Sequence, residues 1–219
     1  MGLLDRIAPR RPPEPEPEAP TPAPVEDPVF STKALRKFLG MLSAKAAPTL
    51  LDLAPVVSDN LNFFGDHLGC KVIIEDTYSE VEQRARDGRL AELPGAFSTR
   101  FRHPDNSIDG ILCWDLMDYL DPPAAQALAD QLTRMLKPDG AVLAFFGTTP
   151  PRDSQYTRYV IADDVNLRYR KYPATRGRQS VLANRDIIRL FERLRVSDSF
   201  LLQNHLREIL FRKPTYDTR

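Results

Sequence analysis

The stretch SIDGILCWD (residues 107–115) decides the fold, together with the segments that follow it up to Gly147. Its apolar run ILCW predicts a buried strand. A second apolar run, AVLAFF (residues 141–146), predicts another strand after a gap that is long enough for a helix. A strand–helix–strand unit places its two strands parallel in one sheet. We therefore expect these two strands to lie in a parallel sheet.

The gap between the two strands carries the signals of a helix. Leu128, Leu132 and Met135 recur with the period of one helix face. Asp121 suits the N-cap, and Pro122 suits the first helical position, where a missing N–H group costs nothing. The run LKPDG at residues 136–140 then ends the helix before the second strand begins.

The residues before this unit repeat the alternation of strand and helix. Apolar runs at 49–53 and 71–75 predict two more buried strands. Helical segments follow at 58–68 and 79–87, and residues 97–101 predict a weak further strand. The sequence therefore predicts a doubly wound α/β fold, with helices on both faces of a mostly parallel sheet.

Side chains that cap helices mark three further helix starts. Ser31 or Thr32 precedes an apolar helical stripe, and Asp59 or Asn60 opens the helix that follows the first strand of the sheet. Asn184 is the expected N-cap of a helix near the end of the chain.

The last third of the chain departs from this rhythm. Residues 148–180 are rich in Arg and Tyr, and within them 156–161 and 165–169 predict a hairpin. The runs 196–202 and 206–211 predict two final strands. Because their connection is so short, we expect these two strands to pair antiparallel.

Composition limits the classes of function. The formal net charge is +0, so no overall field favours nucleic acid or a membrane surface. No apolar run approaches the roughly 20 residues that span a bilayer. Cys70 and Cys113 lie in or beside predicted buried strands, where we interpret them as small apolar residues. Such cysteine usage predicts a reducing, cytoplasmic setting.

Residues 1–28 read as a Pro/Glu-rich leader. Residues 8–28 hold nine prolines and five acidic residues, and they have too few apolar side chains to offset the entropy of ordering. We therefore expect a disordered leader before a domain at 29–219. The head of the leader, residues 2–7, is interpreted either as a docking peptide for a protein partner or as a frayed terminus.

The β–α–LKPDG–β unit and the final hairpin resemble the class I S-adenosylmethionine (SAM)-dependent methyltransferases, in which Leu-Lys-Pro-Gly-Gly precedes the fifth strand. This resemblance implies a doubly wound, mostly parallel seven-stranded sheet with an antiparallel C-terminal hairpin strand. It also implies that SAM is the cofactor and that residues 148–180 form a lid or insert over the carboxyl ends of the strands.

The loop after the first strand matches the family only in part. That strand ends in LDLAPVVS (residues 51–58), where the family has apolar-Asp-apolar-Gly-x-Gly-x-Gly. Asp52 matches the acidic position, but Ala54, Val56 and Ser58 stand in the three glycine places. Glycine lets the backbone approach a ligand without a Cβ atom. We therefore expect SAM to bind here more weakly than at a glycine-rich loop.

The second strand ends in two acids. Glu75 and Asp76 follow Asp52 by about 20 residues, the spacing at which an acid binds the ribose hydroxyls of a nucleotide cofactor. A carboxylate has two oxygens that can accept from both hydroxyls of a diol. Asp76 alternatively caps the next helix, which leaves Glu75 as the first choice for the ribose.

Further cofactor contacts are implied by the register of the resemblance. Thr99 lies near the position that reads the adenine amino group, and Cys113 and Trp114 end the fourth strand beside the transferred methyl group. Trp114 either stacks on the adenine or belongs to the core. The residues expected to contact SAM are Asp52, Ala54, Ser58, Glu75, Asp76, Thr99, Cys113 and Trp114.

The lid supplies the expected contacts to the methyl acceptor. We expect a small molecule with a carboxylate or phosphate, because Arg binds such groups through two parallel hydrogen bonds. The candidate contacts are Tyr156, Arg158, Tyr159, Arg168 and Tyr169. No catalytic residue can be assigned from the sequence.

Two other functions compete with methyl transfer. One is a catalytically inactive methyltransferase-like binding or scaffold protein, whose degenerate loop no longer holds SAM. The other is nucleic-acid binding through RYRKY (residues 168–172), which has suitable residue types but is disfavoured by the zero net charge. His103 and His205 have no metal-ligating neighbours, so we expect them to be exposed and no metal to bind.

Overall fold

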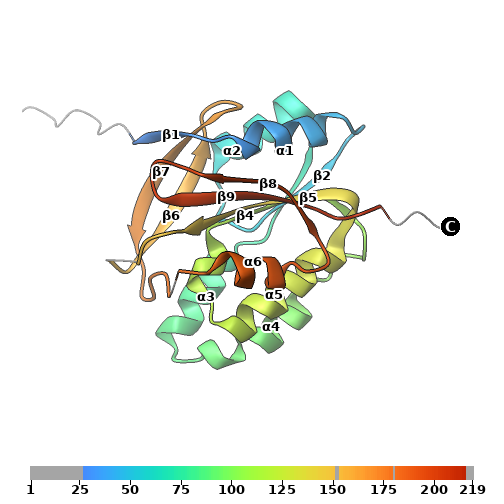
Figure 1. Cartoon of the computed structure of the whole chain (residues 1–219). Helices are drawn as coiled ribbons and strands as arrows, with labels where there is room; N and C mark the ends of the chain where they lie inside the picture. The colour runs from blue at the N-terminus through green and yellow to red at the C-terminus, as the bar shows by residue number, and fades with distance from the viewer. Residues whose placement is uncertain (1–26, 151–152, 180, 216–219) are drawn as a thin grey trace, which may run out of the picture.

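A computed structural model describes residues 27–150, 153–179 and 181–215, which form two sheets and the helices that pack on them (Figure 1). The larger sheet has the strand order β3-β2-β4-β5-β9-β8, and the smaller one has the order β1-β7-β6. The strands of the larger sheet are β2 (Thr49–Asp52), β3 (Lys71–Ile74), β4 (Ile108–Trp114), β5 (Leu136–Gly147), β8 (Arg195–Leu201) and β9 (Leu206–Arg212).

The larger sheet is parallel in its first part and antiparallel at its end. Strand β2 pairs parallel with both β3 and β4, and β4 pairs parallel with β5. Strand β9 then inserts antiparallel between β5 and β8. This confirms the doubly wound α/β fold, the four parallel strands and the antiparallel C-terminal hairpin.

The strand predicted at 97–101 is wrong. Residues Leu93–Arg100 form helix α4, which follows the short 3-10 helix η2 (Leu90–Glu92). Pro94 stands in its first turn, and the buried side chains of Leu93 and Phe97 lie one helical turn apart. This helix stands where a seventh strand was expected, so the larger sheet of the described residues has six strands rather than seven.

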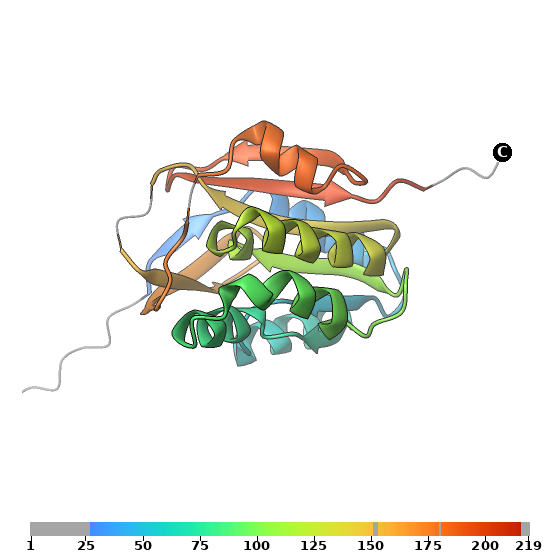
Figure 2. The same cartoon turned by 90° about the horizontal axis from the view of Figure 1, so that it is seen from below.

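Two hydrophobic clusters fill the space on the two faces of the larger sheet, as the alternation of strand side chains requires. Leu51, Ile111 and Val142 face one cluster, whereas Leu50, Leu112 and Leu143 face the other. Figure 2 shows the helices of the first face, which are α3 (Thr77–Arg86), α4, α5 (Pro122–Met135) and α6 (Asn184–Leu190). The other face is covered by α1 (Ala34–Ser43), α2 (Ser58–Asn62) and the π-helix η1 (Phe63–His67).

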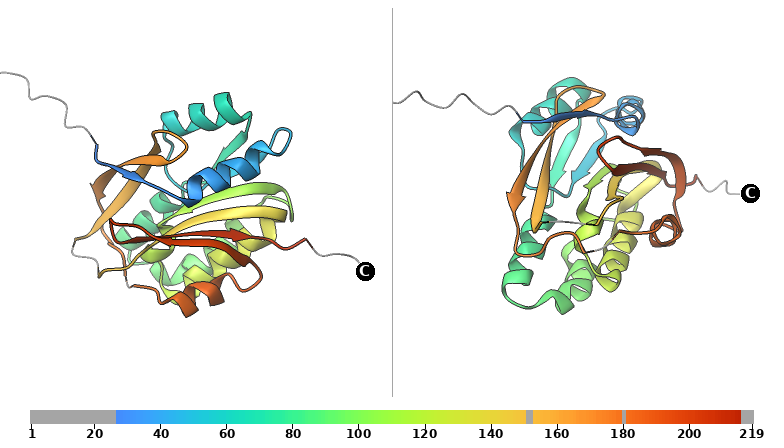
Figure 3. Two further views of the ribbon diagram at one scale, coloured as in Figure 1. Left: turned by 45° about the horizontal axis from the view of Figure 1, so that its top comes forward. Right: turned by 60° about the vertical axis from the view of Figure 1, so that its left-hand side comes forward.

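The smaller sheet stands at the end of the larger sheet where β5 ends (Figure 3). Strands β6 (Gln155–Ile161) and β7 (Asn166–Pro173) form the predicted hairpin, which is longer than expected. The short strand β1 (Val29–Ser31) pairs with β7, a pairing that the sequence did not predict. Asp27, which was assigned to the leader, accepts hydrogen bonds from Arg170.

Residues 1–26 of the predicted leader, with its head at 2–7, lie outside the described residues. Within the described residues, no helix combines the length and the apolar character that crossing a membrane requires.

Most of the predicted helix caps are replaced by other groups. Asp121 caps α5 as predicted, accepting from the backbone N–H of Ala124 at 3.0 Å. Lys33, not Ser31 or Thr32, stands at the N-cap of α1. Val57 and Ala183 stand at the N-caps of α2 and α6, and neither makes a side-chain cap. The caps predicted at Asp59 or Asn60 and at Asn184 are therefore wrong.

Candidate functional site

The carboxyl ends of β2 and β4 meet through a buried hydrogen bond. Asp52 Oδ1 accepts from Trp114 Nε1 at 2.7 Å and from the backbone N–H of Ala54 at 3.0 Å. Burial raises the pKa of Asp52 to about 6. The Asp52 side chain therefore fixes the start of the loop at 53–58 and is almost closed to solvent.

Trp114 is held in the core at this junction. Its ring stacks on the ring of Tyr159 of β6, with the ring centroids 5.2 Å apart and the planes 13° apart. The centroid of the Phe145 ring lies 5.9 Å from that of Trp114. Cys113 is fully buried on the opposite face of the sheet, where burial raises the pKa of its thiol. Of the two alternatives for Trp114, the structure shows the position in the core. Tyr159, from the segment predicted as a lid, covers the Trp114 ring.

Glu75 stands at the carboxyl end of β3 and is partly exposed. Its Oε2 accepts from Arg100 Nη2 at 3.1 Å, and its Oε1 lies 2.9 Å from His103 Nε2. The prediction that His103 is exposed and isolated is therefore wrong, because its ring is largely covered and lies beside Glu75. Each oxygen of Glu75 keeps a further lone pair for a ligand.

Asp76 serves the helix rather than the sheet edge. Its carboxylate accepts from the backbone N–H of Ser79 at 2.9 Å and from Ser79 Oγ at 2.7 Å, which makes it the N-cap of α3. Thr99 lies on α4, and its hydroxyl donates to the carbonyls of Gly95 and Ala96 in its own helix. Their roles toward a cofactor stay predictions.

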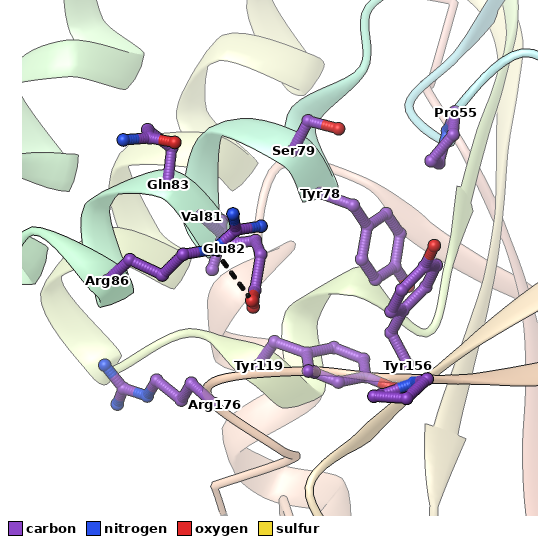
Figure 4. Close-up of a pocket in the computed structure, with 12 residues that line it drawn as sticks. Pro55, Tyr78, Ser79, Val81, Glu82, Gln83, Arg86, Tyr119, Tyr156 and Arg176 are labelled. Carbon is purple, nitrogen blue, oxygen red and sulfur yellow. Dashed lines mark hydrogen bonds and ion pairs between the residues drawn. The ribbon is translucent and has the colours of Figure 1, made fainter.

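A cavity of about 310 Å³ opens beside these strand ends. Pro55 follows β2, Tyr78 follows β3 and Tyr119 follows β4, so the cavity lies at the point where the strand order reverses (Figure 4). Ligands of doubly wound sheets bind at this point. The cavity is lined by Pro55, Tyr78, Ser79, Val81, Glu82, Gln83, Arg86, Tyr119, Tyr156, Pro173, Ala174 and Arg176.

Buried acids lie behind the tyrosines of the cavity. Asp115 accepts from the hydroxyls of Tyr78 and Tyr119, the latter at 3.3 Å. Asp118 accepts from the backbone N–H of Gly147 at 2.7 Å and lies 3.6 Å from Arg178. Burial raises the pKa of Asp118 to about 8. A Cβ atom at position 147 would overlap Nη1 of Arg178, so a larger residue there would displace the guanidinium from Asp118.

The five residues predicted to contact the methyl acceptor do not line one common cavity. Only Tyr156 lines the 310 Å³ cavity. The guanidinium of Arg158 stacks over the ring of Tyr172 at 4.8 Å, and Arg168 pairs with Asp59 at 3.2 Å. Tyr159 and Tyr169 line a smaller cavity of about 110 Å³ on the other side of the hairpin.

The hairpin is fastened to helix α2. Asn60 Nδ2 donates to the carbonyl of Tyr159 at 3.0 Å, and Asn60 Oδ1 accepts from the backbone N–H of Ile161 at 2.8 Å. The amide of Asn60 thus occupies the free edge of β6 as another strand would. Tyr159 is thereby held against Trp114.

Sequence reasoning missed most of the cavity. Tyr78 and Glu82 lie one turn apart on α3, yet neither residue was predicted to have a role in the site. Arg176 lies in a segment assigned only as lid. The one available signal was the WDLMDY run at 114–119, whose acids and tyrosine directly follow a buried strand. Among residues 27–150, 153–179 and 181–215 there is no group of three or more metal-ligating side chains.

A scan against protein-family models gives no match, and a search of curated proteins gives none either. Solved structures do match. The CcbJ methyltransferase from Streptomyces caelestis gives a TM-score of 0.50 at 13% identity, over 82% of this chain and 95% of that one. The [4+2]-cyclase SpnF gives 0.51 at 11% identity, over 82% of both chains.

A third neighbour, the glycopeptide N-methyltransferase MtfA solved with SAM, gives a TM-score of 0.48 at 15% identity, over 82% of this chain and 92% of that one. A methyltransferase and a cyclase on one architecture illustrate that this fold does not fix the reaction. The strand order, the antiparallel hairpin and the structural likeness together give this chain the class I methyltransferase fold.

Proposed function

We propose that this chain is a SAM-dependent methyltransferase for a small-molecule acceptor. The observation that carries the proposal is the 310 Å³ cavity at the switch point of the sheet, which opens beside the strand ends that bear Asp52 and Glu75. An acid after the second strand is the group that binds the ribose hydroxyls of a nucleotide cofactor on doubly wound folds.

The residues at the sheet edge fit the cofactor in two respects. Glu75 is partly open and keeps acceptor positions for the ribose hydroxyls. Asp52 contributes by holding the backbone of Ala54.

SAM supplies an electrophilic methyl group on its sulfonium. The chain's own residues bind and orient: Glu75 takes the ribose hydroxyls, and the cavity holds the acceptor. Rate enhancement then comes from positioning, which is worth several orders of magnitude when reacting groups are aligned.

Titration with S-adenosylhomocysteine by isothermal calorimetry tests this proposal. We expect saturable binding that weakens about tenfold or more in Glu75→Ala, because losing a charged acceptor costs roughly 1.5–3 kcal/mol. Glu92→Ala is the matched control, since Glu92 also pairs with arginines but lies on η2. If Glu75→Ala and Glu92→Ala bound S-adenosylhomocysteine with equal affinity, Glu75 would not be a ligand-binding residue.

A second candidate is a catalytically inactive methyltransferase-like binding or scaffold protein. It is favoured by the side chains in the glycine places and by Tyr159, which covers Trp114 where the cofactor would lie. Absence of saturable binding at millimolar ligand in the same titration would favour it over methyl transfer. A protein partner for the leader and a cytoplasmic location remain proposals from the sequence.

A further inference from the structure

The 310 Å³ cavity has an aromatic end and a charged end. Figure 4 shows Tyr78, Tyr119 and Tyr156 grouped at one side, with Glu82, Arg86 and Arg176 at the other. A ligand that fills it must therefore offer an apolar part to the first end and a polar part to the second.

The aromatic end is built for a flat ligand. The ring of Tyr78 lies edge-on to Tyr119 at 5.4 Å and tilted against Tyr156 at 5.9 Å. Their arrangement is fixed from behind, because the hydroxyls of Tyr78 and Tyr119 donate to Asp115. An aromatic ring of a ligand would meet these rings edge-to-face or in an offset stack, the arrangements that aromatic pairs prefer.

The charged end is left with one positive charge. Glu82 Oε1 lies 3.3 Å from Arg86 Nε, and the Glu82 carboxylate accepts from the backbone N–H of Thr175 at 2.9 Å and from Thr175 Oγ1 at 2.6 Å. Burial works to raise the pKa of Glu82, but the bonds from Thr175 and Arg86 outweigh it and lower the pKa. Glu82 is thus ionised and neutralised by Arg86.

Arg176 has no carboxylate partner among the described residues, and it comes from the loop that closes the cavity. Its guanidinium presents parallel N–H donors that match a carboxylate. The two arginines expected from the sequence do not serve here, because Arg158 stacks on Tyr172 and Arg168 pairs with Asp59.

We propose that the cavity binds a planar aromatic carboxylate, with its ring among Tyr78, Tyr119 and Tyr156 and its carboxylate on Arg176. This inference rests on the proposed function only in naming the ligand as the methyl acceptor. The ring of the ligand would meet the three tyrosine rings at one end of the cavity, and its carboxylate would meet Arg176 at the other end.

Calorimetric titration with 2-naphthoate tests the inference, and three analogues separate its parts. The neutral 2-naphthylmethanol should bind about tenfold or more weakly, since it lacks the charge-assisted bond. Cyclohexanecarboxylate, which keeps the charge but loses the flat ring, should also bind more weakly. Tighter binding of 2-naphthylmethylamine than of 2-naphthoate would overturn the proposal and assign the charged end to Glu82.

Variants locate the carboxylate contact. Arg176→Ala should weaken 2-naphthoate about tenfold, and Arg176→Lys should weaken it less, since it keeps the charge without the forked geometry. Arg168→Ala is the control, because Arg168 lies on β7, pairs with Asp59 and does not line the cavity, so this change should leave binding unchanged. Equal losses in Arg176→Ala and Arg168→Ala, or no loss in either, would refute the assignment.

The same protein distinguishes this inference from the proposed function. Binding of 2-naphthoate without binding of S-adenosylhomocysteine would leave the cavity assignment standing and reject methyl transfer. Binding of S-adenosylhomocysteine without any binding of 2-naphthoate would reject the aromatic carboxylate and leave methyl transfer standing.

Discussion

Asp118 is a buried carboxylate whose protonation should control how stability depends on pH. Its pKa of about 8, raised by burial, lies well above the 3.8 of an ordinary Asp. The folded state therefore binds the proton more tightly than the unfolded state between these values, so the free energy of unfolding should fall as pH rises from about 4 to 8. Asp52 has a pKa of about 6. It should therefore also make the free energy of unfolding fall with rising pH, over the lower half of this range.

Replacing Asp118 by Asn isolates this contribution. The amide oxygen can still accept from Gly147, but it carries no charge to desolvate. We expect urea unfolding between pH 5 and pH 8 to show a smaller loss of stability in Asp118→Asn than in the wild type. Asp130→Asn, on the exposed face of α5, should retain the wild-type slope. Parallel pH profiles for all three proteins would contradict the buried ionisation.

The acids at the strand ends were predictable from the sequence, but their partners were not. Asp52 was identified because it stands near the end of a short apolar strand. Its bond to Trp114 links positions 62 residues apart and depends on a left-handed backbone at Trp114, with φ of 50°. Neither the separation nor a positive φ at a bulky residue leaves a local signal.

Helix α1 begins on a side chain from a distant strand. Glu208 of β9 is completely buried, and its Oε2 accepts from the backbone N–H of Lys33 at 2.8 Å. This bond takes the place of the local cap, so the start of α1 and the hairpin β8–β9 stabilise each other. We expect Glu208→Ala to lower the free energy of unfolding by about 1–3 kcal/mol in urea denaturation, because buried donors lose their acceptor.

Glu208→Gln serves as the control, because the amide oxygen keeps an acceptor for Lys33. It should cost less than Glu208→Ala. An alanine variant as stable as the wild type would mean that water replaces the carboxylate without loss.

Elements with a long apolar period were predictable, and short ones were not. The sequence of helix α5 shows an apolar residue once per helical turn, the N-cap Asp121 and a terminating LKPDG run, and the helix forms as expected. The run at 97–101 is too short for periodicity to separate strand from helix, and packing of Leu93 and Phe97 decides for helix α4. Strand β1 has three residues and depends on β7, so it carries no signal of its own.

At the scale of the whole molecule, the parallel pairing of β3, β2, β4 and β5 could be expected from the alternation of strands and helices, because such connections bring the strands into one sheet side by side. The position of the smaller sheet could not. It is determined by Asn60 at the edge of β6 and by Phe30, whose ring lies 6.2 Å from Tyr159 and 5.8 Å from Tyr169. These contacts assemble the cavity walls, so most of the candidate site stayed hidden in the sequence.

Strand β1 should mark the boundary between dispensable and required sequence. Residues 2–26 are rich in proline and have no apolar period, so deleting them should leave the melting temperature within a few degrees. A deletion of residues 2–31 also removes Phe30, which packs on Phe145 at 6.3 Å and on the tyrosines of the hairpin. Phe30 is partly buried, and the longer deletion also removes the pairing of β1 with β7, so we expect the melting temperature to fall by several degrees.

Scanning calorimetry of the two truncated proteins beside the full chain measures the difference. We expect the shorter deletion to unfold with the full chain and the longer one to unfold clearly earlier. A large drop already in the shorter deletion would mean that the leader packs on the folded body. Equal melting of all three proteins would mean that the hairpin keeps its place without β1, because Asn60 and the stack of Tyr159 on Trp114 suffice to hold it.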